Sequence, residues 1–358
     1  MRMKLPITGA ILVAVALLSG CRTGPVEPVS ETELLLGTTI TVSIYQDPPQ
    51  GAFSEVFARV LEIEQKMSTS TEDYSTTEIL EVNRGAHGDP VPVSPDTFHV
   101  VRRGIEFSRI SRGAFDVSVS PLVQLWGIGT DGAQVPEEAE IEAAVALVDY
   151  RDVDLYPAQY AIGFERPGMG IDVGGIAKGY AADEAVRILS ELGVEHALLD
   201  FGGNILTVGL KPDGSRWRIG VQNPSQTRGS YVGIVEIEEA AVVTSGPYER
   251  FFIQDGVRYH HILDTDGGYP VRNGLASVTI VSPDSTAADA LSTACFALGL
   301  QEGLALVRSL DEVEGIFVTD TGAVHLTDGL KERFTLASSD FRLADPPSTG
   351  TDDAPTRQ

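Results

Sequence analysis

The chain has 358 residues, of which 42% are hydrophobic and 22% are charged, a composition typical of a folded globular protein. Its 51 acidic residues outnumber its 26 basic residues, so the net charge is −25. Nucleic acid and anionic lipid surfaces would repel such a chain, and we expect it to bind neither directly. Solubility is the simplest reason for this charge. A site for a polyphosphate would need local compensation by a lysine or a metal ion.

The first twenty residues are typical of an export signal. Arg2 and Lys4 precede an apolar segment, 7–18, which is too short for a usual membrane-spanning helix. The sequence Leu-Ser-Gly-Cys at 18–21 resembles a bacterial lipobox. We therefore expect a lipoprotein signal peptide over 1–20, a lipid on Cys21 and a lipidated tether over 21–32. The protein would be anchored by lipid alone in the bacterial envelope, facing the periplasm or the exterior; an ordinary signal peptide or an uncleaved anchor is the alternative.

The first half of the chain is predicted to be mainly helical. Apolar residues recur at helical spacing, and a capping box at 75–78 opens a short helix that ends at Arg84. We expect a first strand over 33–45 and helices over 53–67, from the capping box at 75–78 to residue 84, over 94–113 and over 137–148.

Strand-like segments dominate after residue 150. They are expected at 152–156, 160–164, 196–200, 204–209, 216–221, 230–238, 241–245, 250–253, 258–263 and 276–281, with a final hairpin over 314–326. Helices are expected at 176–192, 284–298 and 301–310. Residues 341–358 are polar and proline-rich and are expected to be disordered. The prediction is one α+β domain over 33–340, with a helical first half and a sheet-rich second half.

Residues 169–183, MGIDVGGIAKGYAAD, are the most informative segment. The alternation over 169–173 predicts the end of a strand, and Gly174-Gly175 predicts a turn into a helix. Backbone N–H groups at a helix start, with Lys178 in the first turn, favour an anion site, most plausibly for a phosphate. A tight turn without any ligand is the alternative.

Asp289 and Thr293 lie four residues apart on the predicted helix 284–298, so both side chains are on one face. A carboxylate and a hydroxyl are hard oxygen ligands that suit Mg²⁺. A surface hydrogen bond between the two is the alternative. Cys295 lies on the same apolar helix and is expected to be a small buried residue.

His260 and His261 end a predicted strand, and alternation places them on opposite faces. A zinc site is not expected, because no cysteine or third histidine stands near them in the sequence. One of the two is a candidate acid or base near neutral pH. A hydrogen-bonded structural histidine is the alternative.

Together these segments resemble one family, the FAD:protein FMN transferases, which are the ApbE flavin transferases of bacterial envelopes. The resemblance covers about residues 33–335, and its motifs occur in the family's order. They are LGTT at 36–39, MSTS at 67–70, EILEVN at 78–83, GAFDVS at 113–118, PLVQLWG at 121–127, IDVGGIAKGYAAD at 171–183, LDFGGN at 199–204, HHILD at 260–264 and ADALSTA at 288–294.

The resemblance implies an ApbE-like mixed α/β fold with FAD as donor substrate and Mg²⁺ as cofactor. A threonine or serine hydroxyl of an envelope electron-transport protein would accept the FMN, and AMP would leave. His261 would act in catalysis, activating the acceptor hydroxyl. Mg²⁺ would be held by Gly175 through its carbonyl, Asp289 and Thr293, with Ser292 as a weaker candidate. The residues implied at FAD are Leu36, Ser70, Ala114, Phe115, Asp116, Asp172, Lys178 and Leu263.

Some positions depart from the family pattern. Thr265 and Gly267 replace a proline and a threonine after the His-Ile-Leu-Asp motif, which predicts a looser turn. Ser70 stands where the family usually has tyrosine or asparagine, and Leu36 replaces a methionine. Ser70 leaves open an alternative in which water accepts the FMN, which would make the protein an FAD pyrophosphatase. A flavin-binding lipoprotein without turnover is a third interpretation. The chain lacks the family's acceptor motif, so self-flavinylation is not expected.

Overall fold

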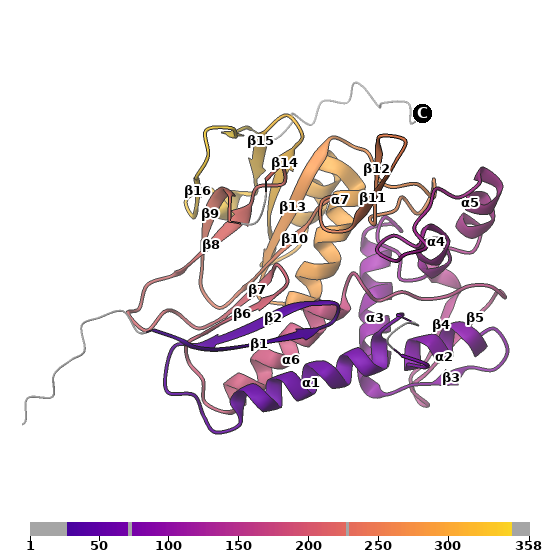
Figure 1. The fold of residues 1–358 in the computed structure, drawn as a ribbon, viewed down its shortest axis with the longest axis horizontal. Helices are drawn as coiled ribbons and strands as arrows, with labels where there is room; N and C mark the ends of the chain where they lie inside the picture. Colours follow the sequence, from indigo (N-terminus) through magenta and orange to yellow (C-terminus); the bar gives the residue numbers. More distant parts are fainter. Residues whose placement is uncertain (1–26, 71–73, 227–228, 346–358) are drawn as a thin grey trace, which may run out of the picture.

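The computed structural model describes residues 27–70, 74–226 and 229–345. Within these ranges a large sheet crosses the molecule, with the strand order β1-β2-β6-β7-β10-β13-β14-β15-β17 (Figure 1). Neighbouring strands are antiparallel except for the parallel pair β15–β17. The strands are β1 (Val29–Leu35), β2 (Thr38–Ile44), β6 (Ala197–Phe201), β7 (Asn204–Val208), β10 (Ala241–Ser245), β13 (Leu275–Ser282), β14 (Glu314–Thr319), β15 (Ala323–Leu326) and β17 (Arg342–Leu343).

Helices cover one face of this sheet. Helices α1 and α6 pack together, and α7 packs against α6, β10 and β13 (Figure 1). Gly299, with φ 81° and ψ 180°, interrupts α7, in agreement with the two helices predicted at 284–298 and 301–310. The helices are α1 (Ala52–Met67), α2 (Glu78–Gly85), α3 (Pro95–Ile110), α4 (Ser120–Trp126), α5 (Glu138–Val145), α6 (Ala177–Glu191) and α7 (Ser285–Arg308).

Three smaller sheets complete the described part of the chain. The sheet β16-β9-β8 lies over the other face of the large sheet, β3-β5-β4 lies beside α2, and β11-β12 is a separate hairpin. Their strands are β3 (Val91–Pro92), β4 (Val153–Tyr156), β5 (Ala161–Phe164), β8 (Trp217–Gln222), β9 (Tyr231–Ile237), β11 (Phe251–Gln254), β12 (Val257–His260) and β16 (Phe334–Leu336).

Alternation along the central strands supplies a core on each face of the large sheet. Val243 and Ile280 pack under the helices, whereas Val242 and Val281 pack against Trp217 on the opposite face. Each such side chain contributes roughly 1.5–3 kcal/mol when it is fully buried. The predicted α+β fold class is confirmed.

The predicted first strand over 33–45 is wrong, because the chain reverses at Leu36-Gly37. Both residues have positive φ, 53° and 66°, as a two-residue type I′ hairpin turn requires, and Leu35 pairs with Thr38. The strand before this turn begins at Val29. Residues 29–32 therefore belong to the sheet and not to the predicted tether.

Other differences concern boundaries and short elements. Thr77, not Ser75, caps α2 by accepting a hydrogen bond from the Leu80 N–H. Residues 169–173 form an isolated bridge at Gly170 and not a regular strand. Helix α4 was not predicted, and residues 342–343 of the predicted tail pair with β15. The predicted signal peptide, the lipidation site Cys21 and residues 346–358 lie outside the described residues.

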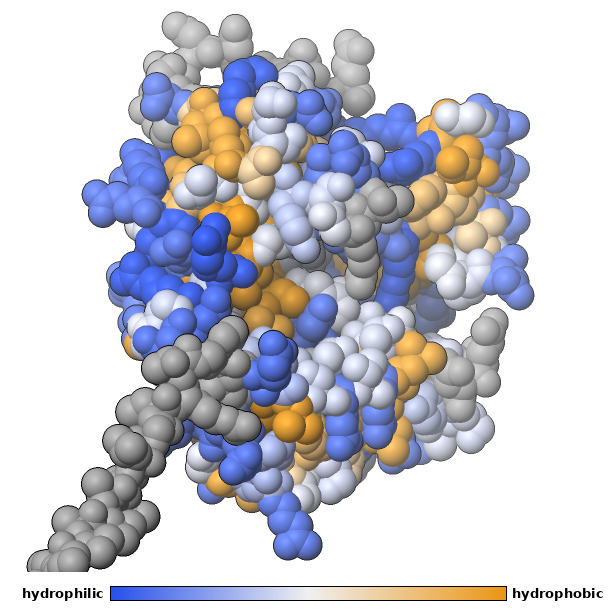
Figure 2. Space-filling view, turned by 60° about the vertical axis from the view of Figure 1, so that its left-hand side comes forward, coloured by the Kyte–Doolittle hydropathy of each residue, from blue (hydrophilic) through white to orange (hydrophobic). Residues whose placement is uncertain are grey.

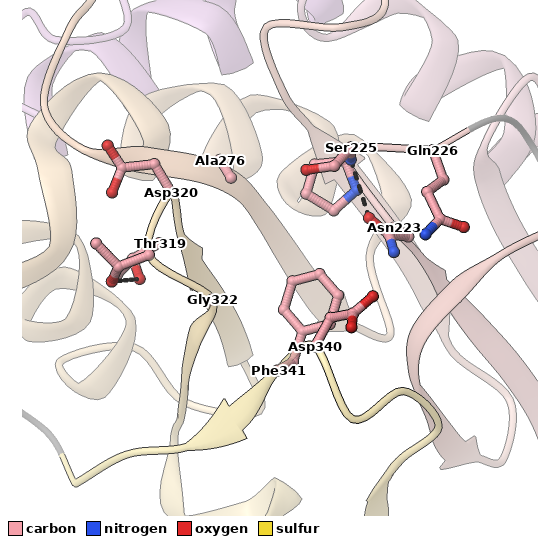
Figure 3. A pocket seen from close by; sticks show the side chains of 11 residues that line it. Asn223, Ser225, Gln226, Ala276, Thr319, Asp320, Gly322, Asp340 and Phe341 are labelled. Carbon is pink, nitrogen blue, oxygen red and sulfur yellow. Dashed lines mark hydrogen bonds between the residues drawn. The ribbon is translucent and has the colours of Figure 1, made fainter.

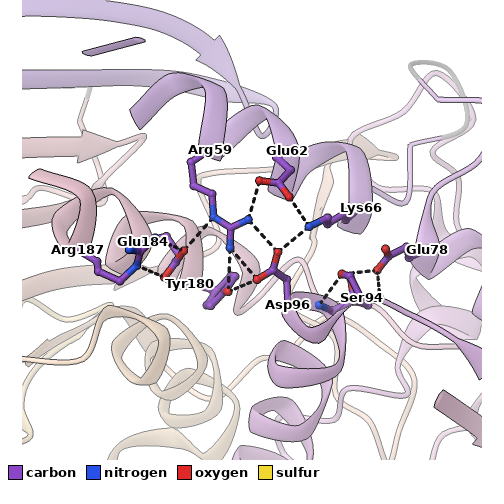
Figure 4. Close-up of polar contacts among 10 residues, drawn as sticks. Arg59, Glu62, Lys66, Glu78, Ser94, Asp96, Tyr180, Glu184 and Arg187 are labelled. Atoms are coloured by element: carbon purple, nitrogen blue, oxygen red, sulfur yellow. Dashed lines mark hydrogen bonds and ion pairs between the residues drawn. The ribbon is translucent and has the colours of Figure 1, made fainter. Parts of the chain in front are cut away.

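An ion-pair network joins α1, α3 and α6 (Figure 4). Arg59 donates to Asp96 at 2.7 Å and to Glu184 at 2.9 Å, while Lys66 and the Tyr180 hydroxyl each donate to Asp96 at 2.7 Å. Burial alone would raise the pKa of Asp96, but these donors outweigh it and hold that pKa well below its usual range. The network fixes the start of α6, which carries Lys178.

Helix α7 is the one described helix long and apolar enough to cross a membrane, and more than half of its apolar window is buried. Helix α7 is therefore a core helix, and it supports the site described next. On the surface, the face in Figure 2 shows separate apolar patches between hydrophilic areas.

Candidate active site

Helices α6 and α7 touch at Gly179. A Cβ at this position would lie 2.3 Å from the Ser285 carbonyl oxygen, so only glycine allows this approach. The Gly179 N–H donates to Asp289 Oδ2 at 2.9 Å. The contact therefore brings the start of α6 and the middle of α7 together, across 110 residues of sequence.

Asp183, one turn further along α6, caps α7. Its carboxylate accepts hydrogen bonds from the Ser285 N–H at 2.9 Å, the Thr286 N–H at 2.8 Å and the Thr286 hydroxyl at 2.6 Å. Burial raises the pKa of Asp183 to about 6 despite these donors. The glycine and the aspartate of the segment GYAAD thus position α7 and do not face a ligand.

The start of α6 differs from the open anion site that the double glycine predicted. Asp172 Oδ1 accepts the Gly174 N–H at 2.7 Å, and the Val173 carbonyl accepts the N–H groups of Ile176 and Ala177. Asp289 takes the Gly179 N–H. Most of the N–H groups at the start of α6 are therefore satisfied within the protein, and an anion here would depend mainly on side-chain donors.

Oxygen atoms gather where α6 meets α7. Asp289 is 3% exposed, and its Oδ1 lies 3.7 Å from Lys178 Nζ. Thr293 Oγ1 lies 3.2 Å from the Ser245 hydroxyl and 3.7 Å from where a Cβ of Gly175 would be. The structure thus places Gly175 beside Thr293, and Lys178 beside Asp289.

This group of residues suits Mg²⁺. Among the described residues, no cluster of three or more His, Cys, Asp or Glu side chains could hold a metal ion. One buried carboxylate with a weakly paired oxygen and a hydroxyl are hard oxygen groups of the kind that Mg²⁺ accepts when substrate phosphates and water supply the rest. Ser292 fits less well, because its hydroxyl donates to the Asp289 carbonyl at 2.9 Å and also meets Ser245 at 2.7 Å.

His261 is half-buried, and its ring orientation is set by the main chain. Nδ1 lies 3.2 Å from the Arg250 carbonyl oxygen, which can only accept, so Nδ1 carries the proton and Nε2 keeps its lone pair. Burial, aided by the charges of Arg250 and Lys178, lowers the pKa of His261 to about 4. The neutral ring at pH 7 is able to accept a proton at Nε2.

His260 is the structural histidine of the pair. It is 6% exposed, its Nε2 donates to the Val271 carbonyl at 2.9 Å, and its Nδ1 accepts the Ile262 N–H at 3.3 Å. Both ring nitrogens are satisfied, so His260 is fully used by the fold.

Asp116 and Asp172, the two other carboxylates predicted at FAD, differ from each other in their surroundings. Asp116 is buried, and its oxygens accept from the Ser118 N–H, the Ser118 hydroxyl and the Tyr150 N–H, so its side chain serves the fold. Asp172 accepts from Gly174, and Thr69 donates to it at 3.5 Å. Burial raises the pKa of Asp172, against the charge of Arg250.

The remaining candidates at FAD differ in how deeply they are buried. The Phe115 ring lies against Gly175, where a Cβ would come within 3.1 Å of it, and Ala114 precedes it in the loop after α3. Leu263 is buried in a cluster with Leu122 and Trp126, and its main chain forms an isolated bridge with Pro270. Leu36 is half-buried at the tip of the β1–β2 hairpin, and Ser70 is half-buried just after α1.

The turn after Asp264, for which the sequence predicts a looser conformation, is held by hydrogen bonds. Thr265, in place of the proline, donates its hydroxyl hydrogen bond to the Gly113 carbonyl at 2.7 Å. The Asp264 N–H donates to Tyr269, and Trp126 Nε1 donates to the Gly268 carbonyl at 2.8 Å. A side-chain hydrogen bond therefore holds the turn to the loop that carries Ala114 and Phe115.

The sequence prediction missed Ser245 and Arg250. Ser245 ends β10 and meets Thr293, while Arg250 precedes β11 and its carbonyl accepts both the His261 N–H at 3.1 Å and the ring Nδ1. The sequence held one signal for Arg250, the two predicted strands 250–253 and 258–263. Pairing these strands as a hairpin places residue 250 opposite residue 261.

A hollow of about 250 Å³ lies away from these residues (Figure 3). Thr319 and Asp320 stand on one side of it and Asn223, Ser225 and Gln226 on the other, with Phe341 between. It shares no residue with the candidate site. A second hollow, of about 270 Å³, lies between the large sheet and β8–β9 and includes Tyr248 and Glu249.

Comparisons with known proteins identify the family of this chain. The ApbE family profile matches residues 36–317. A FAD:protein FMN transferase of Treponema pallidum is 35% identical, over 89% of this chain and 92% of its own, and one of Klebsiella pneumoniae is 35% identical, over 88% and 97%. The crystal structure of the ApbE protein of Thermotoga maritima is similar with a TM-score of 0.77, at 30% identity over 85% of this chain and 98% of that one. The apo flavinyl transferase ApbE of Pseudomonas stutzeri has a TM-score of 0.75, at 31% identity over 87% and 98%.

Proposed function

This chain belongs to the ApbE family, and on that premise we propose that it is a FAD:protein FMN transferase. One observation of the structure carries the proposal beyond family membership. The Lys178 ammonium lies 3.7 Å from Asp289, the Thr293 hydroxyl lies beside Gly175, and the charge of Lys178 acts on the neutral His261 ring. Cleavage of a diphosphate bond is promoted by such a set of groups, because cations and metal ligands offset the phosphate charge and a base accepts the proton.

The reaction breaks one phosphoanhydride bond of FAD. The acceptor hydroxyl oxygen bonds to the phosphorus of the FMN part, the bond from this phosphorus to the AMP oxygen breaks, and AMP leaves. The hydroxyl proton goes to a base, and Nε2 of His261 is the unprotonated nitrogen that the hydrogen bond to Arg250 leaves available. Lys178 supplies positive charge near the diphosphate.

Gly175, Asp289 and Thr293 would hold Mg²⁺. When bound, the ion would neutralise charge on the phosphate oxygens. The protein's contribution is rigidity: Gly179 fixes one carboxylate oxygen of Asp289, and Asp183 fixes the start of the helix that carries Asp289 and Thr293.

The test uses the full chain in detergent with FAD and Mg²⁺, with and without an acceptor protein that carries Asp-x-x-Thr-Gly-Ala-Thr. AMP is measured by chromatography, and flavin bound to protein is measured by in-gel fluorescence after denaturation. We expect a fluorescent acceptor, lost in Asp289→Ala and kept in Asp328→Ala, which changes an exposed carboxylate in the 3₁₀ turn after β15. AMP without a fluorescent acceptor would instead identify an FAD pyrophosphatase, and bound FAD without AMP a flavin-binding protein.

We also propose that the protein is a lipoprotein of the bacterial envelope, anchored through Cys21, and that its acceptor belongs to envelope electron transport. The Leu-Ser-Gly-Cys sequence at 18–21 supports the anchor. Metabolic labelling with a palmitate analogue should mark the wild type and not Cys21→Ala, whereas equal labelling of both would contradict the assignment.

A further inference from the structure

Arg250 is exposed, yet its side chain follows a defined path at the edge of the candidate site. Its Cδ lies 3.6 Å from where a Cβ of Gly129 would be, and one Nη lies 3.7 Å from where a Cβ of Gly37 would be. Both glycines have positive φ, 95° and 66°. The arginine side chain therefore crosses from the loop after α4 to the tip of the β1–β2 hairpin, beside Leu36.

This guanidinium has no hydrogen bond or ion pair within 4 Å in the described part of the chain. Arg59, Arg103, Arg151, Arg166 and Arg187, by contrast, are each paired with a carboxylate. In a chain with 51 acidic residues and 26 basic ones, a guanidinium without a carboxylate partner retains its full set of donors for a ligand.

Arg250 also faces the reacting part of the site. Its carbonyl oxygen holds the His261 ring. Its positive charge acts on two neighbours, lowering the pKa of His261 and opposing the rise in the pKa of Asp172. Lys178, the other cation that acts on His261, is already 3.7 Å from Asp289.

We propose that the guanidinium of Arg250 binds the diphosphate of FAD. This inference rests on the proposed function, in which the diphosphate is the anionic part of the substrate. The planar fork of an arginine matches phosphate oxygens in a way that an ammonium does not. Because the N–H groups at the start of α6 are mostly satisfied internally, a side chain has to supply these donors.

The test is a binding measurement that needs no turnover. The full chain in detergent is titrated with ADP, with adenosine and with riboflavin by calorimetry, in the presence of Mg²⁺. Arg250→Gln should weaken ADP binding roughly ten- to a hundredfold, as expected for a charged hydrogen-bond pair, and leave riboflavin and adenosine unchanged. Arg250→Lys should recover part of the affinity. Arg258→Gln is the matched control, because Arg258 is also exposed and near the site but stacks on Phe251, with its guanidinium carbon 4.3 Å from the ring centre.

The inference is overturned if Arg250→Gln binds ADP as the wild type does, or if riboflavin loses as much affinity as ADP. It is equally overturned if the wild type binds ADP no better than adenosine. Unchanged thermal unfolding of Arg250→Gln separates a lost contact from a damaged fold. A chain that binds ADP through Arg250 but never labels an acceptor would refute the proposed function alone.

Discussion

Gly179→Ala is the substitution that most directly tests how the fold builds the site. A Cβ at residue 179 would lie 2.3 Å from the Ser285 carbonyl oxygen and 2.8 Å from the Thr286 Cα, both of them backbone atoms of α7. Ordinary contact begins at 3.4 Å, so α6 and α7 would have to separate by about 1 Å. Overpacking of this kind costs about 1–3 kcal/mol, and alanine recovers only about 1 kcal/mol through helix propensity.

The expected results are a lower melting temperature and a larger loss of activity. A net loss of about 1 kcal/mol lowers the melting temperature by roughly 2–4 °C. The Gly179 N–H also holds Asp289, so the shift displaces this carboxylate, and a displacement of about 1 Å in a positioned group costs on the order of a hundredfold in rate. Thermal unfolding and AMP release measure the two effects.

Gly85→Ala is the matched control. Residue 85 ends α2, and its Cβ would lie 3.4 Å from Val91 Cγ2, which is ordinary contact. We expect an unchanged rate and an equal or higher melting temperature. Wild-type activity and stability in Gly179→Ala would show that the contact between α6 and α7 does not position Asp289.

Three further substitutions or titrations test other parts of the structure. Asp96→Asn should lower the free energy of unfolding, measured in urea, by roughly 1–3 kcal/mol, since the cations of Arg59 and Lys66 lose their shared carboxylate. The pKa of Asp96 is lowered in the folded protein. The stabilisation by this carboxylate should therefore be present above the unfolded pKa of 3.8 and disappear as the pH falls below it. Thr265→Val, which keeps the shape of the side chain, should cost about 1 kcal/mol and raise the KM for FAD, and an unchanged melting temperature would argue against the hydrogen bond to Gly113. The pKa of about 4 for His261 predicts that its NMR signal, assigned with His261→Asn, stays constant from pH 8 to pH 5. The contribution of the neutral ring to the free energy of unfolding should be lost as the pH falls from 6.5 through 4. A titration midpoint of the NMR signal near pH 6.5 would contradict the burial of the ring.

Periodicity in the sequence was sufficient for most of the described helices and strands, although it did not predict α4. The helix over 53–67 and the strand over 241–245 appear in the structure within a residue of the prediction, because each buries one continuous apolar face. The strand predicted over 33–45 failed because the leucines before the turn and the β-branched residues after it resemble one continuous strand. The turn between them needs positive φ angles at Leu36 and Gly37. Leucine, which occupies one of these positions, rarely adopts such a conformation.

The order of motifs in the sequence by itself determined the family and the residues to consider. Only the tertiary structure decided where each one lies: Thr293 is beside Gly175 and Asp289 beside Lys178, while Asp183 holds the start of a helix and Asp116 accepts hydrogen bonds inside the fold. The physical reason is that local periodicity records which face of an element is buried, whereas the partner of a buried carboxylate depends on a contact across a hundred or more residues. The same holds for Arg250. Its position beside His261 depends on the pairing of two strands, and no sequence motif marks it.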